Sequence, residues 1–241
     1  MIEIIDVHKS FGRLEILRGI NMEVEKNKVH SILGASGSGK STLLQCINGL
    51  ESIQQGRISV DGIDVGDKAT NLNALRTKIG IVFQQFNVFP HLTTLENITL
   101  ALKVVMKKTT KEAKEIAVLQ LERIGLGDKV DVYPSKLSGG QQQRLAIARA
   151  LAMSPSYMLF DEITSALDPM LVGEVLDALR GLKENGMTMM IVTHEIRFAK
   201  EVSDTVSFLH KGKVIESGPP GDIIDNPREV ETIKFLERSL N

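Results

Sequence analysis

The sequence predicts an α/β fold that combines a parallel central sheet with an N-terminal antiparallel β part and a helical insertion. The strand-like run VHSIL (residues 29–33) leads directly into a glycine-rich loop and then into the helical pattern STLLQCINGL. The later runs YMLFD and MTMMIVTH are apolar without alternation, which is typical of strands buried on both faces of a parallel sheet. Between these two parts, residues 93–124 carry apolar side chains at helical spacing.

The N-terminal region is expected to form antiparallel strands. The runs IEIIDV, INMEVE and GRISVDG alternate between apolar and polar residues, and FGR and Asp61-Gly62 are typical turn sequences.

The helical insertion begins at a capping box formed by Thr93 and Glu96. An apolar face continues to Ile124, so the pattern predicts a helical stretch from residue 93 to residue 124. We expect a single domain, residues 1–241, in which 1–84 and 137–241 form the core and 85–136 form the helical subdomain.

The C-terminal part is expected to alternate between helices and strands. Helices are predicted from about Pro169 to Asn185 and from Glu195 to Val202. The run VSFLHKGKVIESG predicts a hairpin that turns at Lys211-Gly212, and NPREVETIKFLERSL predicts a closing helix.

Composition and charge give little support to several classes of function. The formal net charge is -1, which does not favour nucleic acid as a partner. No signal-peptide pattern and no apolar run of about 20 residues is present, so a cytosolic chain is expected. The single cysteine, Cys46, lies in a helical pattern and is expected to be a core residue.

The glycine-rich loop matches the phosphate-binding pattern G-x-x-x-x-G-K-[ST] between a strand and a helix. Its backbone N–H groups wrap phosphates, Lys40 supplies positive charge and the Ser41 hydroxyl can bind Mg²⁺. We call residues 34–42 the P-loop; its expected ligand-binding residues are Gly34, Ala35, Ser36, Gly37, Ser38, Gly39, Lys40, Ser41 and Thr42.

Two carboxylates and a histidine follow the two buried strands. Asp161 and Glu162 end YMLFDE, and His194 ends MTMMIVTH. Ligands of open α/β sheets bind beyond the carboxyl ends of the strands, so these side chains should meet the P-loop. Asp161 suits Mg²⁺, Glu162 suits the polarisation of an attacking water, and His194 suits a γ-phosphate. A helix-start acid and a helix cap are the alternatives for Glu162 and His194.

Three further features have open alternatives. Phe11, in the turn sequence KSFGR, suits stacking on adenine or packing in a core. Gln84 follows the strand-like run IGIVF and suits a contact with metal or water. The apolar residues of QFNVFPHL, residues 85–92, indicate either a partner surface or packing within the insertion.

A second phosphate-like motif is LSGGQQQR, residues 137–144, which we call the LSGGQ segment. Ser138 and Gln141 have capping-box spacing at a helix start, and Gly139 and Gly140 leave the first N–H groups uncovered.

Six motifs in order resemble the ATP-binding cassette (ABC) ATPases: the P-loop, Gln84, the LSGGQ segment, YMLFDE, SALD (residues 165–168) and His194. The resemblance implies ATP hydrolysis with Mg²⁺ by two cassettes paired head to tail. The residues that it implies act in trans, across the pair, are Ser138, Gly139, Gly140, Gln141 and Asp168. It implies Glu162, His194 and Gln84 as catalytic residues and Ser41, Gln84 and Asp161 as Mg²⁺ ligands.

Longer stretches such as VFQQFNVFPHLTTLENITLA are similar to the ATPase subunits of polar amino-acid importers. That resemblance implies a homodimer that docks on a membrane permease near Gln85–Leu92, at the cytoplasmic face of the membrane, and works indirectly with a periplasmic or extracellular substrate-binding protein. Ile163 and Ala35 replace prolines common in the subgroup, and EKNKVH lacks a usual glycine.

Two alternatives compete with a transport ATPase. A soluble ABC-type ATPase of repair or translation typically has a coiled-coil insertion or two cassettes in one chain, and neither is present. A monomeric P-loop kinase or GTPase leaves the LSGGQ segment and SALD unexplained.

Overall fold

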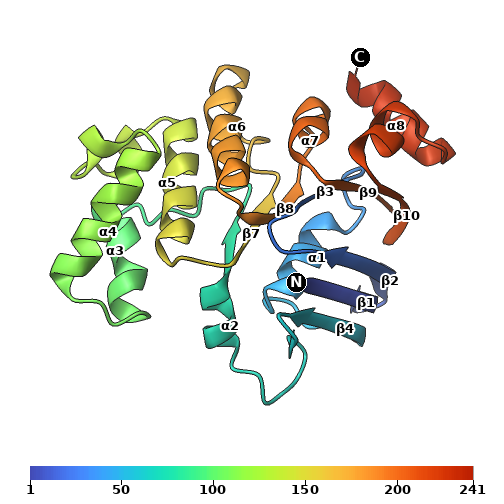
Figure 1. Ribbon diagram of the computed structural model, residues 1–241, viewed down its shortest axis with the longest axis horizontal. Helices are drawn as coiled ribbons and strands as arrows, with labels where there is room; N and C mark the ends of the chain where they lie inside the picture. The colour runs from blue at the N-terminus through green and yellow to red at the C-terminus, as the bar shows by residue number, and fades with distance from the viewer. Residues whose placement is uncertain (241) are drawn as a thin grey trace.

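The computed structural model describes residues 1–240, with side chains through Ser239, and contains two sheets (Figure 1). The larger sheet has six strands in the order β10-β9-β3-β8-β7-β6. Neighbouring strands from β9 to β6 are parallel and β10 pairs antiparallel with β9, which confirms the predicted hairpin. Their bounds are β3 Val29–Leu33, β6 Ile79–Val82, β7 Tyr157–Asp161, β8 Thr188–Val192, β9 Thr205–His210 and β10 Lys213–Gly218.

The smaller sheet is antiparallel and has the order β2-β1-β4-β5. Its strands are β1 Ile2–Phe11, β2 Leu14–Val24, β4 Gln55–Val60 and β5 Ile63–Asp64. β1 and β2 are longer than the alternating runs that predicted them, because bulges carry the pairing past polar stretches. The inner face of this sheet shares a core with helix α1 (Lys40–Ile47), so the sheet lies against the helix that follows the P-loop.

The predicted helical stretch from Thr93 to Ile124 is two helices, α3 (Thr94–Val104) and α4 (Thr110–Arg123). The chain turns between them, where Lys107 has a left-handed φ of 54°. Thr109 and Glu112 form a second capping box that starts α4, in addition to the predicted box at Thr93.

Helix α5 (Gly139–Ala152) contributes side chains to two hydrophobic cores. One core is shared with α3 and α4, and the other with the large sheet and helix α6 (Pro169–Glu184). Short 3₁₀ turns, η1 (Gly127–Lys129) and η2 (Pro134–Lys136), connect α4 to α5. The predicted boundary at residue 137 separates the helical subdomain from the core of the domain. It stays a prediction, because α5, which starts just after it, packs against both the helices of the insertion and the large sheet.

Helices α7 (Ile196–Val202) and α8 (Val230–Leu240) lie where the sequence predicted them. Two elements lacked a clear signal: α2 (Leu72–Lys78), capped by Asn71, and the π-helical turn η3 (Gly221–Asp225). Cys46 is buried in the core, as expected.

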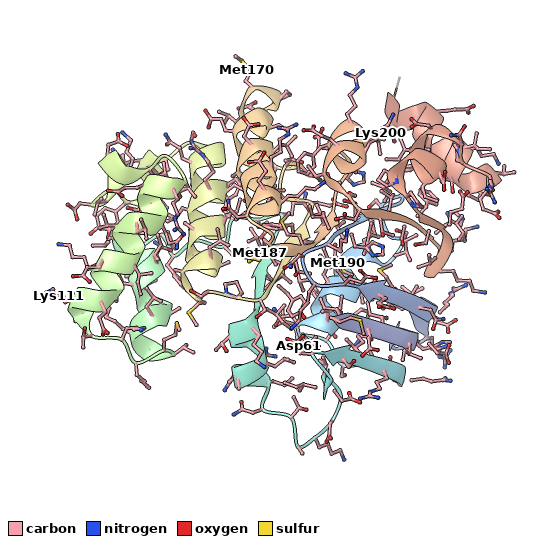
Figure 2. All side chains as sticks on the ribbon, in the orientation of Figure 1. Asp61, Lys111, Met170, Met187, Met190 and Lys200 are labelled. Atoms are coloured by element: carbon pink, nitrogen blue, oxygen red, sulfur yellow. The ribbon has the colours of Figure 1, made fainter. Side chains whose placement is uncertain are left out.

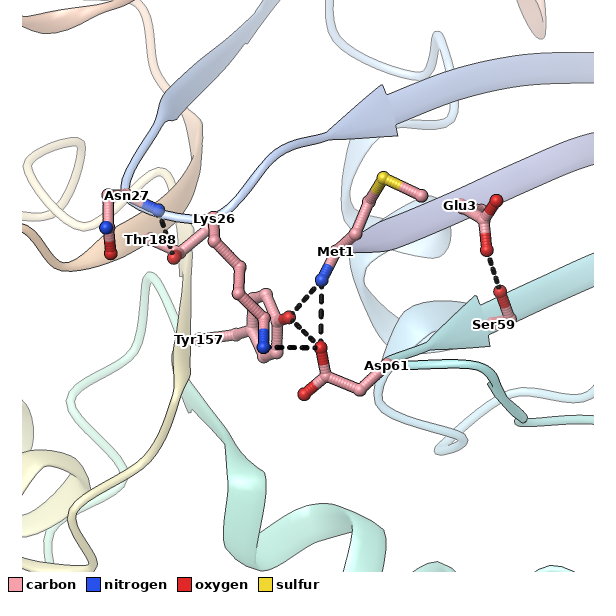
Figure 3. Close-up of polar contacts among 8 residues, drawn as sticks. All are labelled: Met1, Glu3, Lys26, Asn27, Ser59, Asp61, Tyr157 and Thr188. Atoms are coloured by element: carbon pink, nitrogen blue, oxygen red, sulfur yellow. Dashed lines mark hydrogen bonds and ion pairs between the residues drawn. The ribbon is translucent and has the colours of Figure 1, made fainter.

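A polar cluster joins the two sheets near the amino ends of the parallel strands (Figure 3). The Tyr157 hydroxyl, at the start of β7, donates to Asp61 Oδ1 at 2.6 Å, and Lys26 Nζ lies 3.2 Å from the same oxygen. The amino group of Met1 contacts both Asp61 and Tyr157. The hydrogen bond from Tyr157 holds the pKa of Asp61 well below its ordinary value, and burial raises the pKa of Tyr157.

Asn27, beside this cluster, explains how EKNKVH does without the usual glycine. Its φ is 60°, in the left-handed region that glycine favours and asparagine tolerates. Its N–H donates to Thr188 Oγ1 at 2.9 Å, which ties the turn before β3 to the start of β8.

Candidate active site

The P-loop connects β3 to α1, as the sequence predicted, and two of its glycines are required by close approaches. A Cβ on Gly34 would lie 2.2 Å from the carbonyl oxygen of Leu209, and one on Gly39 would lie 2.8 Å from Leu17 Cδ2. Both residues also have positive φ values, so side chains there are excluded by space and by backbone conformation.

Two polar side chains of the P-loop, Lys40 and Ser38, are buried within it. Lys40, which is 4% exposed, donates from Nζ to the carbonyl oxygens of Gly34 at 2.8 Å and Ala35 at 3.1 Å. Ser38 Oγ is buried and has no hydrogen-bond partner among the residues that the structure describes. A buried hydroxyl without a partner and an ammonium held in the loop by two backbone carbonyl oxygens fit a phosphate group.

The carboxylates at the end of β7 lie beside the P-loop. Ser41 Oγ donates to Asp161 Oδ1 at 2.8 Å, and Lys40 Nζ lies 3.3 Å from Glu162 Oε1. Burial raises the pKa of Asp161. A hydroxyl and a carboxylate in contact form the oxygen-rich donor set that Mg²⁺ prefers.

Glu162 and His194 form a hydrogen-bonded pair. His194 Nε2 lies 2.9 Å from Glu162 Oε1, and this contact is the main cause that lowers the pKa of Glu162. Glu162 has a left-handed φ of 48°, and its N–H donates to the carbonyl oxygen of Val192 at 2.9 Å. The next residue, Ile163, is 3% exposed and packs in the core, which holds this turn in place.

Two further predicted site residues, Phe11 and Gln84, lie outside this hydrogen-bonded arrangement. Phe11 is 47% exposed at the end of β1, so packing in a core does not describe it. Gln84 is exposed two residues beyond β6, whose last residue Val82 pairs with Phe160 next to Asp161. Gln84 therefore extends from the same sheet edge as the carboxylates.

The LSGGQ segment forms the predicted capping box at the start of α5. Gln141 N donates to Ser138 Oγ at 3.3 Å, and Ser138 N donates to Gln141 Oε1 at 3.0 Å. A Cβ on Gly140 would make a tight contact of 3.2 Å with Leu171 Cβ. No hydrogen bond or ion pair within residues 1–239 joins this segment to the P-loop of the same chain.

Sequence reasoning missed the residues that hold the Gln84–Leu92 loop. Asn97 Oδ1 accepts from Phe89 N at 2.8 Å, and its Nδ2 faces the carbonyl oxygens of Phe89, Leu92 and Thr93 at 2.9–3.1 Å. Arg149 Nη1 donates to Asn87 O at 2.8 Å. The sequence signal that could have found Asn97 is its position one turn after Thr93, the residue that caps α3.

An apolar groove of about 580 Å³ lies beside this loop. Phe89, Leu100, Val104 and Val105 line it and are each between 38% and 57% exposed, whereas Val88 packs inward between two cores. The loop therefore combines packing within the fold with an exposed apolar surface.

The ABC transporter family matches residues 17–165, more than half of the chain, and the chain belongs to that family. It is 52% identical to the glutamine transport ATP-binding protein GlnQ of Bacillus subtilis (strain 168) and 49% identical to the glutamate/aspartate import ATP-binding protein GltL of Escherichia coli (strain K12), in both cases over all of both chains.

A solved structure supports the same fold. The chain is similar to the dimeric, post-hydrolysis state of the ATP-binding cassette MJ0796 bound to ADP and Pi, with a TM-score of 0.81 and 36% identity, over 91% of this chain and 99% of that one. No helix within residues 1–240 is long and apolar enough to cross a membrane.

Proposed function

We propose that the protein is the ATP-hydrolysing subunit of an amino-acid importer. The observation that carries the ATPase activity is that Glu162 lies within contact of both Lys40 and His194, at the sheet edge where the P-loop begins. The transport function is supported by full-length relatives whose names describe the transport of amino acids.

The residues of the site divide the work between binding and hydrolysis. The P-loop amides, Ser38 and Lys40 hold the phosphates of ATP, and Phe11 offers a ring to the adenine. Ser41, Asp161 and Gln84 would hold Mg²⁺, which neutralises phosphate charge when bound.

Glu162 serves as the general base that takes a proton from the attacking water. The contact with His194 keeps the pKa of Glu162 low, so the carboxylate is ionised at neutral pH. His194 is 41% exposed and can also reach a γ-phosphate placed between it and the P-loop.

Substitution of the general base tests this mechanism. Glu162→Gln should bind ATP normally and lose turnover by a factor on the order of 10² or more, measured as phosphate release at saturating ATP. Glu184→Gln, an exposed residue at the end of α6, is the matched control. Near-normal hydrolysis by Glu162→Gln would remove Glu162 from this role.

A second copy of the chain would complete the site. The LSGGQ segment presents a capped helix start that no P-loop of its own chain occupies. Asp168 is exposed and directly follows Leu167, whose Cδ2 would lie 3.2 Å from a Cβ on Gly139. Met170, two residues further on, projects from α6 with 93% of its surface exposed (Figure 2), as suits a contact made by another chain. The structural relative is a dimer, which supports this pairing.

The apolar groove beside the Gln84–Leu92 loop would receive a short helix of the permease. Its exposed aliphatic side chains would bind the apolar face of that helix. Because the groove lies next to Gln84, a movement of the site on dimer closure would be transmitted to the membrane subunit. The chain is then a peripheral protein of the cytoplasmic face, and a substrate-binding protein acts indirectly from the other side.

Affinity purification from membranes in mild detergent tests the importer assignment. A polytopic membrane protein should co-purify in near-equal amount and should be lost with Leu100→Asp in the groove. Val230→Asp, another exposed apolar position, should retain it. Recovery from the soluble fraction with ribosomes or repair proteins would overturn transport and favour the soluble ABC-type ATPase.

A further inference from the structure

Lys9 is a buried charge next to Phe11, and nothing in the ATPase mechanism uses it. It is 4% exposed, although lysine is seldom buried without a partner. Its Nζ donates to Glu51 Oε2 at 2.8 Å and to the carbonyl oxygen of Ser52 at 2.8 Å. The same ammonium lies 4.5 Å from the centroid of the Phe11 ring, within the range of a cation–π contact.

These contacts connect the two parts of the fold that an ATP molecule would bridge. Lys9 and Phe11 are two residues apart in β1, so their side chains leave the same face of the strand. Glu51 and Ser52 follow α1, the helix that begins at Lys40 of the P-loop. The ion pair therefore fixes the ring of Phe11 relative to the helix that carries the phosphate site.

We propose that Lys9 is a positioning residue for the nucleotide base. It holds the Phe11 ring from one face, which leaves the exposed part of the ring for the adenine at a set distance from the P-loop. This inference rests on the proposed function, because it assumes that ATP is bound with its phosphates in the P-loop. Glu51 is the anchor of Lys9 and acts through it.

Loss of Lys9 should affect the binding of the base more than it affects the stability of the fold, which distinguishes a positioning residue from a structural ion pair. Removing one partner of a buried ion pair is costly when the other charge stays buried, but the Glu51 side chain is one-third exposed, so water can solvate its carboxylate when methionine of similar length replaces Lys9. The loss of an ordered aromatic platform, in contrast, weakens the binding of a base.

The test compares ATP with inorganic tripolyphosphate, which has the phosphates but no base. Lys9→Met should raise the Kd for ATP about three- to tenfold and leave the Kd for tripolyphosphate unchanged, by isothermal titration calorimetry with Mg²⁺. Lys28→Met, which removes the ion pair with Asp204 at the opposite end of β3, should change neither Kd. Equal affinity of Lys9→Met and the unmodified protein for ATP would overturn the proposal, as would equal losses for both ligands.

A double-mutant cycle tests whether Lys9 acts through the ring. In a Phe11→Leu background, Lys9→Met should raise the Kd for ATP no further, because the platform is already absent. Additive losses would show that Lys9 does not act through Phe11 and would contradict the proposal. If the unmodified protein bound neither ATP nor tripolyphosphate, the proposed function itself would fail, which is a distinguishable result.

Discussion

At the scale of single residues, Glu162 has a conformation that its side chain disfavours. A left-handed backbone costs a residue with a Cβ on the order of 1–3 kcal/mol, and such strain gathers at functional sites. The bond from Glu162 N to Val192 O and the burial of Ile163 offset that cost. The isoleucine that replaces the proline common in the subgroup therefore anchors the turn at Glu162 in the core.

The Tyr157–Asp61 contact makes a prediction about pH. Burial and the hydrogen bond to Asp61 raise the pKa of Tyr157 above its ordinary value of about 10. A raised pKa of Tyr157 means that the contact stabilises the fold fully up to about pH 10 and that this stability is lost as the pH rises through the folded pKa. At acid pH the contact is lost as Asp61 becomes protonated.

Tyrosinate absorbance measures this shift directly, since the chain has two tyrosines and no tryptophan. In a Tyr133→Phe background, Tyr157 should stay protonated above pH 10 until the protein unfolds. Asp61→Asn, which removes the carboxylate, should shift that titration to lower pH. Ionisation of Tyr157 near pH 10 in the folded protein would contradict the contact.

Many residues of the candidate site were predictable because they lie directly after strand-like runs in the sequence. The P-loop, Asp161, Glu162 and His194 each follow a strand, and the parallel sheet brings the ends of those strands together. The pairing of Lys9 with Glu51 was not predictable, because the two residues are far apart in sequence and each looks like an ordinary surface charge.

At the scale of elements, the Gln84–Leu92 loop depends on Asn97. This side chain is fully buried in α3 and satisfies backbone groups of the loop that would otherwise lack partners. Asn97→Leu should lower the free energy of unfolding by about 2–4 kcal/mol, because several polar groups lose their bonds at once.

Urea unfolding measures that loss. Asn185→Leu removes an exposed asparagine that donates to one carbonyl, at the end of α6, and is expected to change stability by less than about 1 kcal/mol. Equal losses for the two variants would show that the loop is held mainly by other contacts.

The break between α3 and α4 shows why the order of elements was easier to predict than their ends. Apolar spacing continues across residues 105–109 closely enough to resemble one helix. The left-handed Lys107 and the capping box at Thr109 end one helix and start the next. The capping-box pattern T-x-x-E at Thr109–Glu112 was present in the sequence, but the helical pattern on both sides of it favoured one continuous helix. Helix α2 was missed because it is short and follows a polar stretch.

At the scale of the whole molecule, the P-loop and the LSGGQ segment lie in different parts of the fold. The P-loop is beside the antiparallel sheet, while α5 packs between α6 and the helices of the insertion (Figure 1). One chain therefore presents two incomplete surfaces, which a head-to-tail pair would bring together.

Dimerisation controlled by ATP is the direct consequence. Glu162→Gln should hold ATP without hydrolysing it, so we expect the pair to persist once nucleotide is bound. Ser138→Arg in the same background places a long cation at the capped helix start and should prevent pairing while monomer affinity for ATP is kept.

Light scattering of Glu162→Gln with and without saturating ATP is the measurement that tests the central claim most directly. We predict the mass of a monomer without ATP, twice that mass with ATP, and a monomer under both conditions when Ser138→Arg is added. A monomer at saturating ATP, or a dimer that Ser138→Arg leaves intact, would contradict the account in which each LSGGQ segment completes the P-loop site of a second chain.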